Sequence, residues 1–287
     1  MSDRTPTAAV PKAISPSPAE REEAAARARR ASRVQLVARY APGILVPLLV
    51  LAGWQLYAST ASVDATILPT PTRIVSQLYQ FRQIAWENTW QTLQETLIGF
   101  SVSVVVALLV AVLMDQMAWL RRSLYPMLIA SQTIPVIAIA PLMIIWFGFG
   151  LLPKVLLIVL VTFFPIVVAL LDGFAATEHE AMDLLRTMGA SRRQIFRLVR
   201  FPGAMPQMFT GLRISATYAV LAAIFAEYVG AYQGLGIWMS TSKSSFRTDL
   251  VFGAIAISAL ISVSLFMLIG LIARLVMPWY YAARRRK

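Results

Sequence analysis

A few ionisable and polar side chains inside long apolar runs are the residues that could do chemistry in this chain. Glu227 lies near one end of the run 211–231, within the sequence AAIFAEYVGAY. An ionisable group in such a segment is a candidate for a gate, or for a contact with a solute or a docked protein. The alternative is a hydrogen-bonded structural carboxyl near the membrane surface. The sequence leaves both interpretations open.

A second candidate group lies in the long uncharged run 123–153. Gln132 and Thr133 precede Pro135, where a helix is expected to kink. Such polar groups could line a pathway, and interhelical hydrogen bonds would explain them equally well. The candidate pathway or gate residues are therefore Gln132, Thr133, Pro135 and Glu227.

Motifs for catalysis are missing from the sequence. It contains no GxxxxGK[ST] phosphate loop, no HExxH and no GxSxG. The absence of cysteine excludes disulfides and Cys-ligated metals, and the single histidine, His179, argues against histidine-based sites. We expect a chain that is not an enzyme and binds no metal or cofactor. If it takes part in ATP-driven transport, ATP and Mg²⁺ are used by a partner ATPase.

The composition indicates an integral membrane protein. The chain is 58% hydrophobic and 14% charged, with a mean hydropathy of +0.66, whereas about 25% of residues in soluble domains are charged. A membrane-spanning helix needs ~20 apolar residues. Six runs approach or exceed that length: 41–58, 92–114, 123–148, 155–171, 211–231 and 250–276. The predicted fold is an all-α membrane protein with six transmembrane helices, the third kinked or tilted at Pro126, Pro135 and Pro141.

The segments outside these runs divide the rest of the chain. Residues 1–39 are rich in Pro, Ala, Ser and Arg and are expected to form a disordered basic tail. Residues 40–58 form the first span, and 59–90 form an extracytoplasmic segment with an amphipathic helix over Arg73–Ile84. Residues 91–277 form the remaining membrane domain, and 278–287 form a basic tail.

The net charge of +12 suggests nucleic acid, but in a membrane protein the placement of the positive charges matters first. With the N-terminus inside, most Lys and Arg fall on the cytoplasmic side. The outer side then holds Arg73, Arg82, Lys154, Lys243 and Arg247. This asymmetry places both termini in the cytoplasm. We expect lipid and protein partners and no nucleic acid.

A polar, basic segment at 178–206 interrupts the apolar sequence. Its pattern predicts two short amphipathic helices with a bend at Gly189, the second ending at Pro202 and Pro206. The segment is too polar to cross a bilayer. It could rest on lipid headgroups, or dock in a groove of a cytoplasmic partner. Amphipathicity alone does not separate these alternatives.

This segment resembles the EAA loop of permease subunits of bacterial ABC importers. Asp183-Leu184-Leu185 stands where that motif has E-A-A, followed by Gly189 and by Val199-Arg200-Phe201-Pro202. Further stretches resemble the nitrate, sulfonate, taurine and thiamine-precursor branch of the binding-protein-dependent transport family. They are Leu68-Pro69-Thr70-Pro71, the run from Thr133-Ile134-Pro135 to Pro141-Leu142, Trp146-Phe147-Gly148-Phe149-Gly150, Lys154, Gly211-Leu212-Arg213, Ala226-Glu227, Gly234-Leu235-Gly236 and Pro278-Trp279.

The resemblance implies a type I importer permease fold in the bacterial inner membrane. Two permease copies, expected to be a homodimer, would form the solute pathway. Cytoplasmic ABC ATPase subunits would dock on the coupling-helix loop, and an extracytoplasmic binding protein would deliver the solute. The expected ATPase-coupling residues are Asp183, Leu184, Leu185, Met188, Gly189, Ala190, Ile195, Phe196, Val199 and Pro202.

The solute is less well defined by the sequence. Phe163-Phe164-Pro165-Ile166 followed by Leu171-Asp172-Gly173 resembles permeases for thiamine pyrimidine precursors or related heteroaromatic compounds. An aliphatic sulfonate, taurine or nitrate is the alternative within the family. Two other classes are open: a secondary carrier or channel that works without an ATPase, and a membrane scaffold without transport activity.

Overall fold

The structure is a computed structural model that describes residues 42–43, 45–60, 64–177 and 179–284. The predicted basic tail at 1–39 lies outside the described residues. The chain divides into two units, 1–61 and 62–287. Most of the described part of the first unit is an apolar helix, Leu45–Thr60, which overlaps the first predicted span and ends two residues beyond it.

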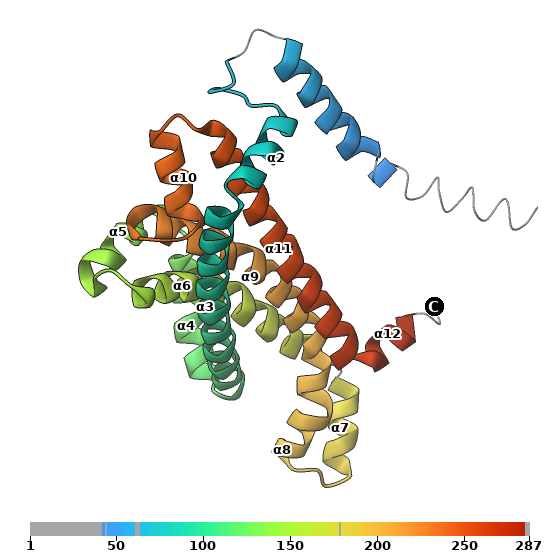
Figure 1. The fold of residues 1–287 in the computed structure, drawn as a ribbon. Coiled ribbons are helices and arrows are strands. Elements are labelled where there is room, and N and C mark those ends of the chain that lie inside the picture. Colours follow the sequence, from blue (N-terminus) through green and yellow to red (C-terminus); the bar gives the residue numbers. More distant parts are fainter. Residues whose placement is uncertain (1–41, 44, 61–63, 178, 285–287) are drawn as a thin grey trace, which may run out of the picture. The chain divides into compact units, whose positions relative to one another are not determined.

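The regular elements among the described residues of the second unit are all helices. Its longer elements, shown in Figure 1, lie side by side as a bundle. In chain order the elements are α2 (Pro71–Gln80), α3 (Arg82–Gln116), α4 (Ala118–Ser131), α5 (Val136–Phe147), α6 (Leu151–Ala175), α7 (His179–Thr187), α8 (Arg192–Ile195), η1 (Phe196–Arg200), α9 (Phe201–Gly230), α10 (Leu235–Ser244), α11 (Thr248–Val276) and α12 (Pro278–Arg284).

Four helical segments of the described chain are long and apolar enough to cross a membrane: 82–116, 151–175, 192–230 and 248–276. The bent pair α4 and α5 could supply a fifth span. The 35-residue α3 is about 52 Å long at a rise of 1.5 Å per residue. It therefore extends well beyond a hydrocarbon core of ~30 Å. The all-α membrane fold is confirmed, whereas the count of six spans stays a prediction.

The third predicted span is two helices. α4 and α5 meet at an angle of 101°, sharper than the kinked helix expected from the sequence. Pro135 is the N-cap residue of α5 in an extended conformation, because a proline has no N–H to continue the helix and disfavours helical geometry in the residue before it. Pro126 and Pro141 lie inside α4 and α5, so one proline makes the main break.

Close contact between α6, α3 and α9 forms the core of the bundle. Small residues allow this contact, as is common between membrane helices. A Cβ added to Gly99 of α3 would lie 2.8 Å from Ile158 of α6, and one on Gly173 of α6 would lie 2.8 Å from the Ala204 carbonyl of α9. The Thr162 hydroxyl bonds to Ser103 at 2.7 Å. Core packing and these buried hydrogen bonds fix the three helices against one another.

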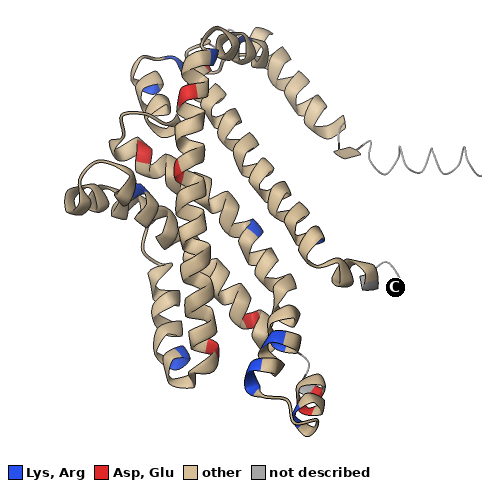
Figure 2. Ribbon diagram, turned by 60° about the horizontal axis from the view of Figure 1, so that its bottom comes forward, with Lys and Arg blue, Asp and Glu red and all other residues tan. Residues whose placement is uncertain are grey.

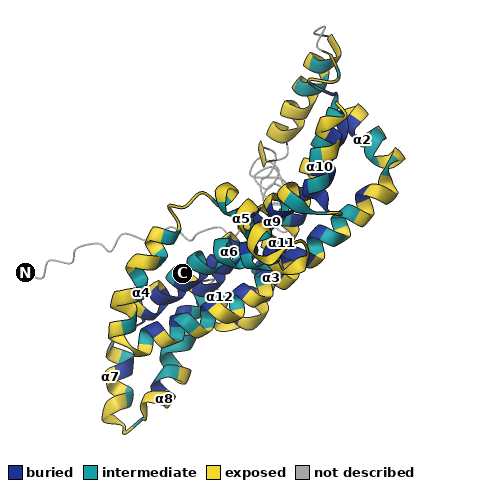
Figure 3. Cartoon of the chain, turned by 90° about the vertical axis from the view of Figure 1, so that its left-hand side faces the viewer, coloured by how far each residue is buried: buried dark blue, intermediate teal, exposed yellow. Residues whose placement is uncertain are grey.

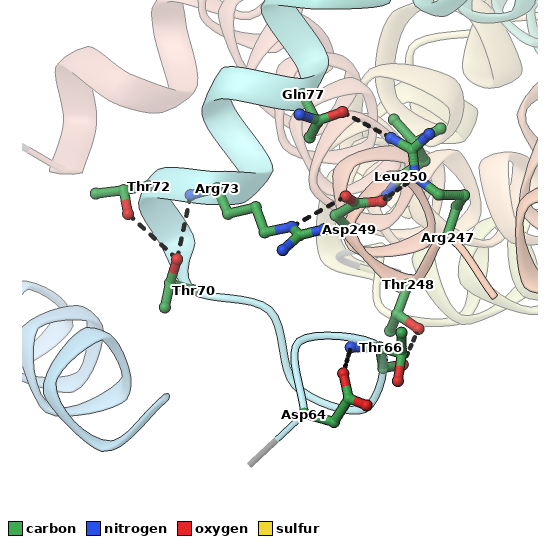
Figure 4. Close-up of polar contacts among 10 residues, drawn as sticks. All are labelled: Asp64, Thr66, Thr70, Thr72, Arg73, Gln77, Arg247, Thr248, Asp249 and Leu250. Carbon is green, nitrogen blue, oxygen red and sulfur yellow. Dashed lines mark hydrogen bonds and ion pairs between the residues drawn. The ribbon is translucent and has the colours of Figure 1, made fainter. Parts of the chain in front are cut away.

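The predicted amphipathic helix at the outer end begins and ends earlier than expected, at Pro71 and Gln80. Ion pairs and a hydrogen bond connect it to the start of α11 (Figure 4). Arg73 Nε lies 3.3 Å from Asp249 Oδ2, and Arg247 Nε lies 3.0 Å from Asp249 Oδ1. Arg247 also donates to Gln77 Oε1 at 2.6 Å. The buried Asp249 carboxylate therefore joins α2 to α11.

A second contact near the same place involves the turn that precedes α2. The Thr248 hydroxyl donates to the Thr66 carbonyl, and the Thr66 N–H donates to Asp64 Oδ1 at 2.9 Å (Figure 4). The hydrogen bond from Thr66 lowers the pKa of the Asp64 carboxyl below its ordinary value. The segment before α2 is thus held against the first turn of α11.

The sequence prediction for Pro202 and Pro206 was wrong, because neither proline ends the second helix of the 178–206 segment. α8 passes through the π-helical turn η1 into α9, which continues to Gly230. Pro202 lies in the first turn of α9, a position where proline is tolerated. The wider π turn directly precedes it. The segment and the span after it therefore form one continuous helical rod, Arg192–Gly230.

Candidate functional site

The bend of the 178–206 segment is built around Gly189. The Gly189 N–H donates to the Arg186 carbonyl at 3.0 Å, and the Ala190 N–H donates to the Leu185 carbonyl at 2.9 Å. This pair of bonds, with the glycine at φ 83°, is a Schellman motif that ends α7. A residue with a Cβ is strained at this φ. The sequence thus predicted the bend at the correct residue.

The helix after the bend starts from a side-chain cap. The Ser191 hydroxyl accepts from the Gln194 N–H, and the Gln194 side chain accepts from the Ser191 N–H at 2.8 Å. This capping box satisfies two of the free donors at a helix start. The Schellman motif ends α7 and the capping box begins α8. Together they fix the backbone conformation of the turn between the two helices.

Aromatic contacts and an ion pair attach the segment to the bundle. The Phe196 ring centroid lies 5.8 Å from that of Phe174 at the end of α6 and 6.0 Å from that of Phe201. Arg200 bonds to Asp115 near the end of α3 at 2.7 Å. These contacts connect η1, which directly follows α8, to α3, α6 and α9.

The expected coupling residues divide by exposure. Asp183, Leu184, Met188 and Gly189 are exposed, and Leu185, Ala190, Phe196, Val199 and Pro202 are partly buried. Ile195 is buried, with 7% of its surface exposed, so it packs within the segment. Leu198, absent from the sequence-based set, is 66% exposed. Figure 3 shows that α7 and α8 are largely exposed.

Several Lys and Arg positions gather at the end of the bundle that carries α7 and α8, beside acidic positions of α7 (Figure 2). A cavity of about 880 Å³ lies between the segment and the end of α3. Arginines contribute most of its charge: Arg186, Arg192, Arg193 and Arg200. The combination of exposed apolar side chains and a basic rim suits a protein groove with acidic edges.

At the opposite end of α9, Glu227 is fully buried. Its Oε1 accepts from the Thr92 hydroxyl at 2.7 Å, and its Oε2 accepts from the Gly236 N–H at 2.7 Å. Gly234 has a φ of 126°, and a Cβ there would overlap the carboxylate. Glu227 therefore joins α3 to the start of α10. The dipole of α10 also stabilises a carboxylate at this end of the helix.

Two side chains of α3 also accept hydrogen bonds from backbone amides of the turn before α10. Asn88 Oδ1 accepts from the Gly234 N–H at 2.8 Å, and Thr92 Oγ1 accepts from the Leu235 N–H at 2.9 Å. Three successive backbone amides of Gly234-Leu235-Gly236 thus have side-chain acceptors. The structure gives Glu227 this anchoring role, and its gating role stays a prediction.

The other candidate pathway residues do not join Glu227 in one described cluster. Gln132, Thr133 and Pro135 lie in the exposed break between α4 and α5. The Thr133 hydroxyl donates to the Ala130 carbonyl at 2.8 Å. Their exposure leaves them free to line a pathway or to contact a second copy, and that role also stays a prediction.

Sequence reasoning missed a buried ion pair near Glu227. Lys154 of α6 lies 2.5 Å from Glu95 of α3, and their side chains are 8% and 1% exposed. The sequence placed Lys154 on the outer side and gave it no partner. The residue lies in the first turn of α6, which begins at Leu151. A Glu and a Lys in separate apolar runs are the available signal, because charges inside a membrane usually pair.

The fold and this site define a helical membrane protein with a basic helix–turn–helix segment at one end of the bundle. The family described as the binding-protein-dependent transport system inner membrane component matches residues 103–280. The chain belongs to this family of ABC importer permeases.

Curated relatives extend the match beyond that region. The riboflavin transport system permease protein RibX of Chloroflexus aurantiacus is 36% identical over 257 residues, which is 88% of this chain and 96% of the relative. The formylaminopyrimidine transport permease protein ThiX of Halalkalibacterium halodurans is 35% identical, over 81% of this chain and 93% of the relative. The taurine transport system permease protein TauC of Escherichia coli is 28% identical, over 81% and 87%.

Solved structures agree on the fold. The inward-facing MetNI methionine ABC transporter matches with a TM-score of 0.61 at 20% identity, over 69% of this chain and 98% of the matched chain. At this identity the likeness concerns the fold alone. The family match and the relatives show that the chain is a multi-span transport subunit of an ABC importer family, so the expectation of a permease is confirmed.

Proposed function

We propose that the 178–206 segment is the coupling loop that docks in a cytoplasmic ABC ATPase. The supporting observation is the exposure of Leu184, Met188 and Leu198, at 62%, 74% and 66%, around a rigid Schellman turn. Exposed apolar side chains on a capped, basic helix pair fit a partner groove. ATP and Mg²⁺ are bound and used by that ATPase. In this proposal the loop and both termini lie on the cytoplasmic side of the membrane.

The permease acts as two copies in this proposal. α4 and α5 contribute a single buried residue, Ala140, to the described chain. Their apolar surfaces, including Ile137 and Ile145 at 63% and 74% exposed, face lipid or a second copy. A homodimer places the Gln132–Pro135 break where it can line the pathway. An extracytoplasmic binding protein delivers the solute.

The proposed solute is a small heteroaromatic compound, such as a thiamine pyrimidine precursor. Two relatives at 35–36% identity are named for riboflavin and formylaminopyrimidine, whereas the taurine relative is 28% identical. Lys154 is paired with Glu95 and therefore offers little to an anionic solute. Taurine, an aliphatic sulfonate or nitrate is the second candidate.

Uptake by the reconstituted complex tests these proposals together. Proteoliposomes that contain the permease, its ATPase and its binding protein should accumulate an aminopyrimidine only when ATP and Mg²⁺ are present. Accumulation without the ATPase would show a secondary carrier instead. Uptake of taurine or nitrate in preference to the heterocycles would overturn the solute assignment and leave the coupling proposal standing.

A further inference from the structure

A small recess lies at the end of the bundle where the charge distribution predicts the outer surface. Its volume is about 190 Å³. It is bounded by α3, by the loop and first turn of α6, and by the end of α9. Its polar and aromatic lining residues are Gln91, Glu95, Phe149, Lys154, Tyr232 and Gln233.

The buried ion pair lies in the lining of this recess. Glu95 Oε1 accepts from Lys154 Nζ at 2.5 Å and from Gln91 Nε2 at 2.6 Å. Glu95 Oε2 is buried and has no hydrogen-bond partner among the described residues. A buried carboxylate oxygen without a hydrogen bond is unfavourable. Lys154 carries three N–H donors, so the pair offers an unused acceptor beside unused donors.

Aromatic rings border the same recess. The Phe149 and Tyr232 ring centroids are 6.1 Å apart and their planes are tilted by 45°. Phe149 stands between Gly148 and Gly150, which have φ values of 74° and 137°. The Tyr232 side chain is 88% exposed, so packing within the described chain does not account for this aromatic pair. Such rings provide faces for a planar ligand.

We propose that this recess is a solute site of the permease, and that its ligand is a neutral single-ring heteroaromatic compound with an amino group beside a ring nitrogen. The ring nitrogen accepts from Lys154, the amino group donates to the Glu95 carboxylate, and the ring stacks on Tyr232. This assignment rests on the proposed heteroaromatic solute and adds a binding site within this chain.

Charge and size favour this class over the alternatives. The recess contains one ammonium group, that of Lys154, and Glu95 at 2.5 Å already neutralises it. An anionic ligand would therefore gain little attraction and would be repelled by the Glu95 carboxylate. Pockets for drug-sized ligands measure roughly 300–1,000 Å³, whereas this recess measures about 190 Å³. A single ring therefore fits it better than a multi-ring flavin.

Equilibrium binding of a tritiated 4-aminopyrimidine to the permease–ATPase complex in nanodiscs, without the binding protein, tests the site. Tyr232→Ala should weaken binding on the order of tenfold, the range of alanine effects on base stacking. Tyr79→Ala, at a residue 72% exposed elsewhere on the same unit, is the matched control and should bind like the wild type.

The exchange variant Glu95→Lys with Lys154→Glu keeps a buried pair and moves the acceptor to the other helix. It should lose about tenfold or more of the affinity. Equal binding by wild type, Tyr232→Ala and the exchange variant would overturn the site, as would tighter binding of taurine than of the aminopyrimidine. If the exchange variant does not insert, the exposed Tyr232→Ala decides alone.

Uptake by the full complex distinguishes failure of the proposed site from failure of the proposed heteroaromatic solute class. Import of aminopyrimidine with an unchanged KM in Tyr232→Ala would overturn the site and leave the proposed solute class intact. No import of any heteroaromatic compound by the wild-type complex would overturn the solute class itself. A raised KM in Tyr232→Ala, with Tyr79→Ala unchanged, would support both.

Discussion

Lys154 and Glu95 form an ion pair 2.5 Å long between α6 and α3, with both side chains almost completely buried. The pair belongs to the same end of the bundle as the Glu227 anchor and lies beside the loop that carries Phe149. Removing one member leaves the other charge buried without its partner, which is far more costly than removing both.

The first prediction concerns this pair. Lys154→Met should destabilise the protein by about 3–5 kcal/mol, because it leaves Glu95 unpaired. The double variant Lys154→Met with Glu95→Leu should recover most of that loss. Reversible denaturation of the purified protein in detergent measures both. A double variant as unstable as the single one would show that the pair does not act as a unit.

A second prediction separates the two roles of Glu227. Glu227→Gln should lower uptake more than it lowers the amount of protein in the membrane. Thr92→Val removes one hydrogen bond to the same carboxylate and is the control for anchoring alone. If uptake falls only in proportion to the amount of protein in the membrane in both variants, Glu227 has a structural role alone.

Gly189 is the subject of the third prediction. Gly189→Val places a β-branched residue at φ 83°, which costs about 1–3 kcal/mol of local strain. The variant should insert normally and uncouple ATP hydrolysis from uptake, because the turn that positions α7 against α8 is distorted. Gly53→Val, where a Cβ meets nothing within 4 Å, should remain coupled. Equal coupling in both variants would contradict a rigid turn.

The fourth prediction concerns Leu198, which is 66% exposed on the same segment. Leu198→Ser should reduce the ATPase that co-purifies with the permease without reducing the yield of permease. Gln207→Ala, at an exposed position of α9, should change neither quantity. A full ATPase complement with Leu198→Ser would remove this side chain from the docking surface.

Local sequence signals predicted much of the fold. Apolar runs predicted the spans, and Gly189 predicted the bend, because both depend on residues close together in the chain. Pro202 was misjudged, since a π turn and its position near a helix start decide whether a proline ends the helix. The pairing of Lys154 with Glu95 was missed, because counting charges cannot show that α6 turns this side chain toward another helix.

Site-directed cross-linking tests the central claim most directly. The chain has no cysteine, so Met188→Cys carries a single photoreactive label on an exposed position of the α7–α8 bend. In membranes with the whole transporter, the account predicts a covalent product with the ATPase, and none when Tyr79→Cys carries the label. A Met188→Cys label that reacts only with phospholipid would contradict the account.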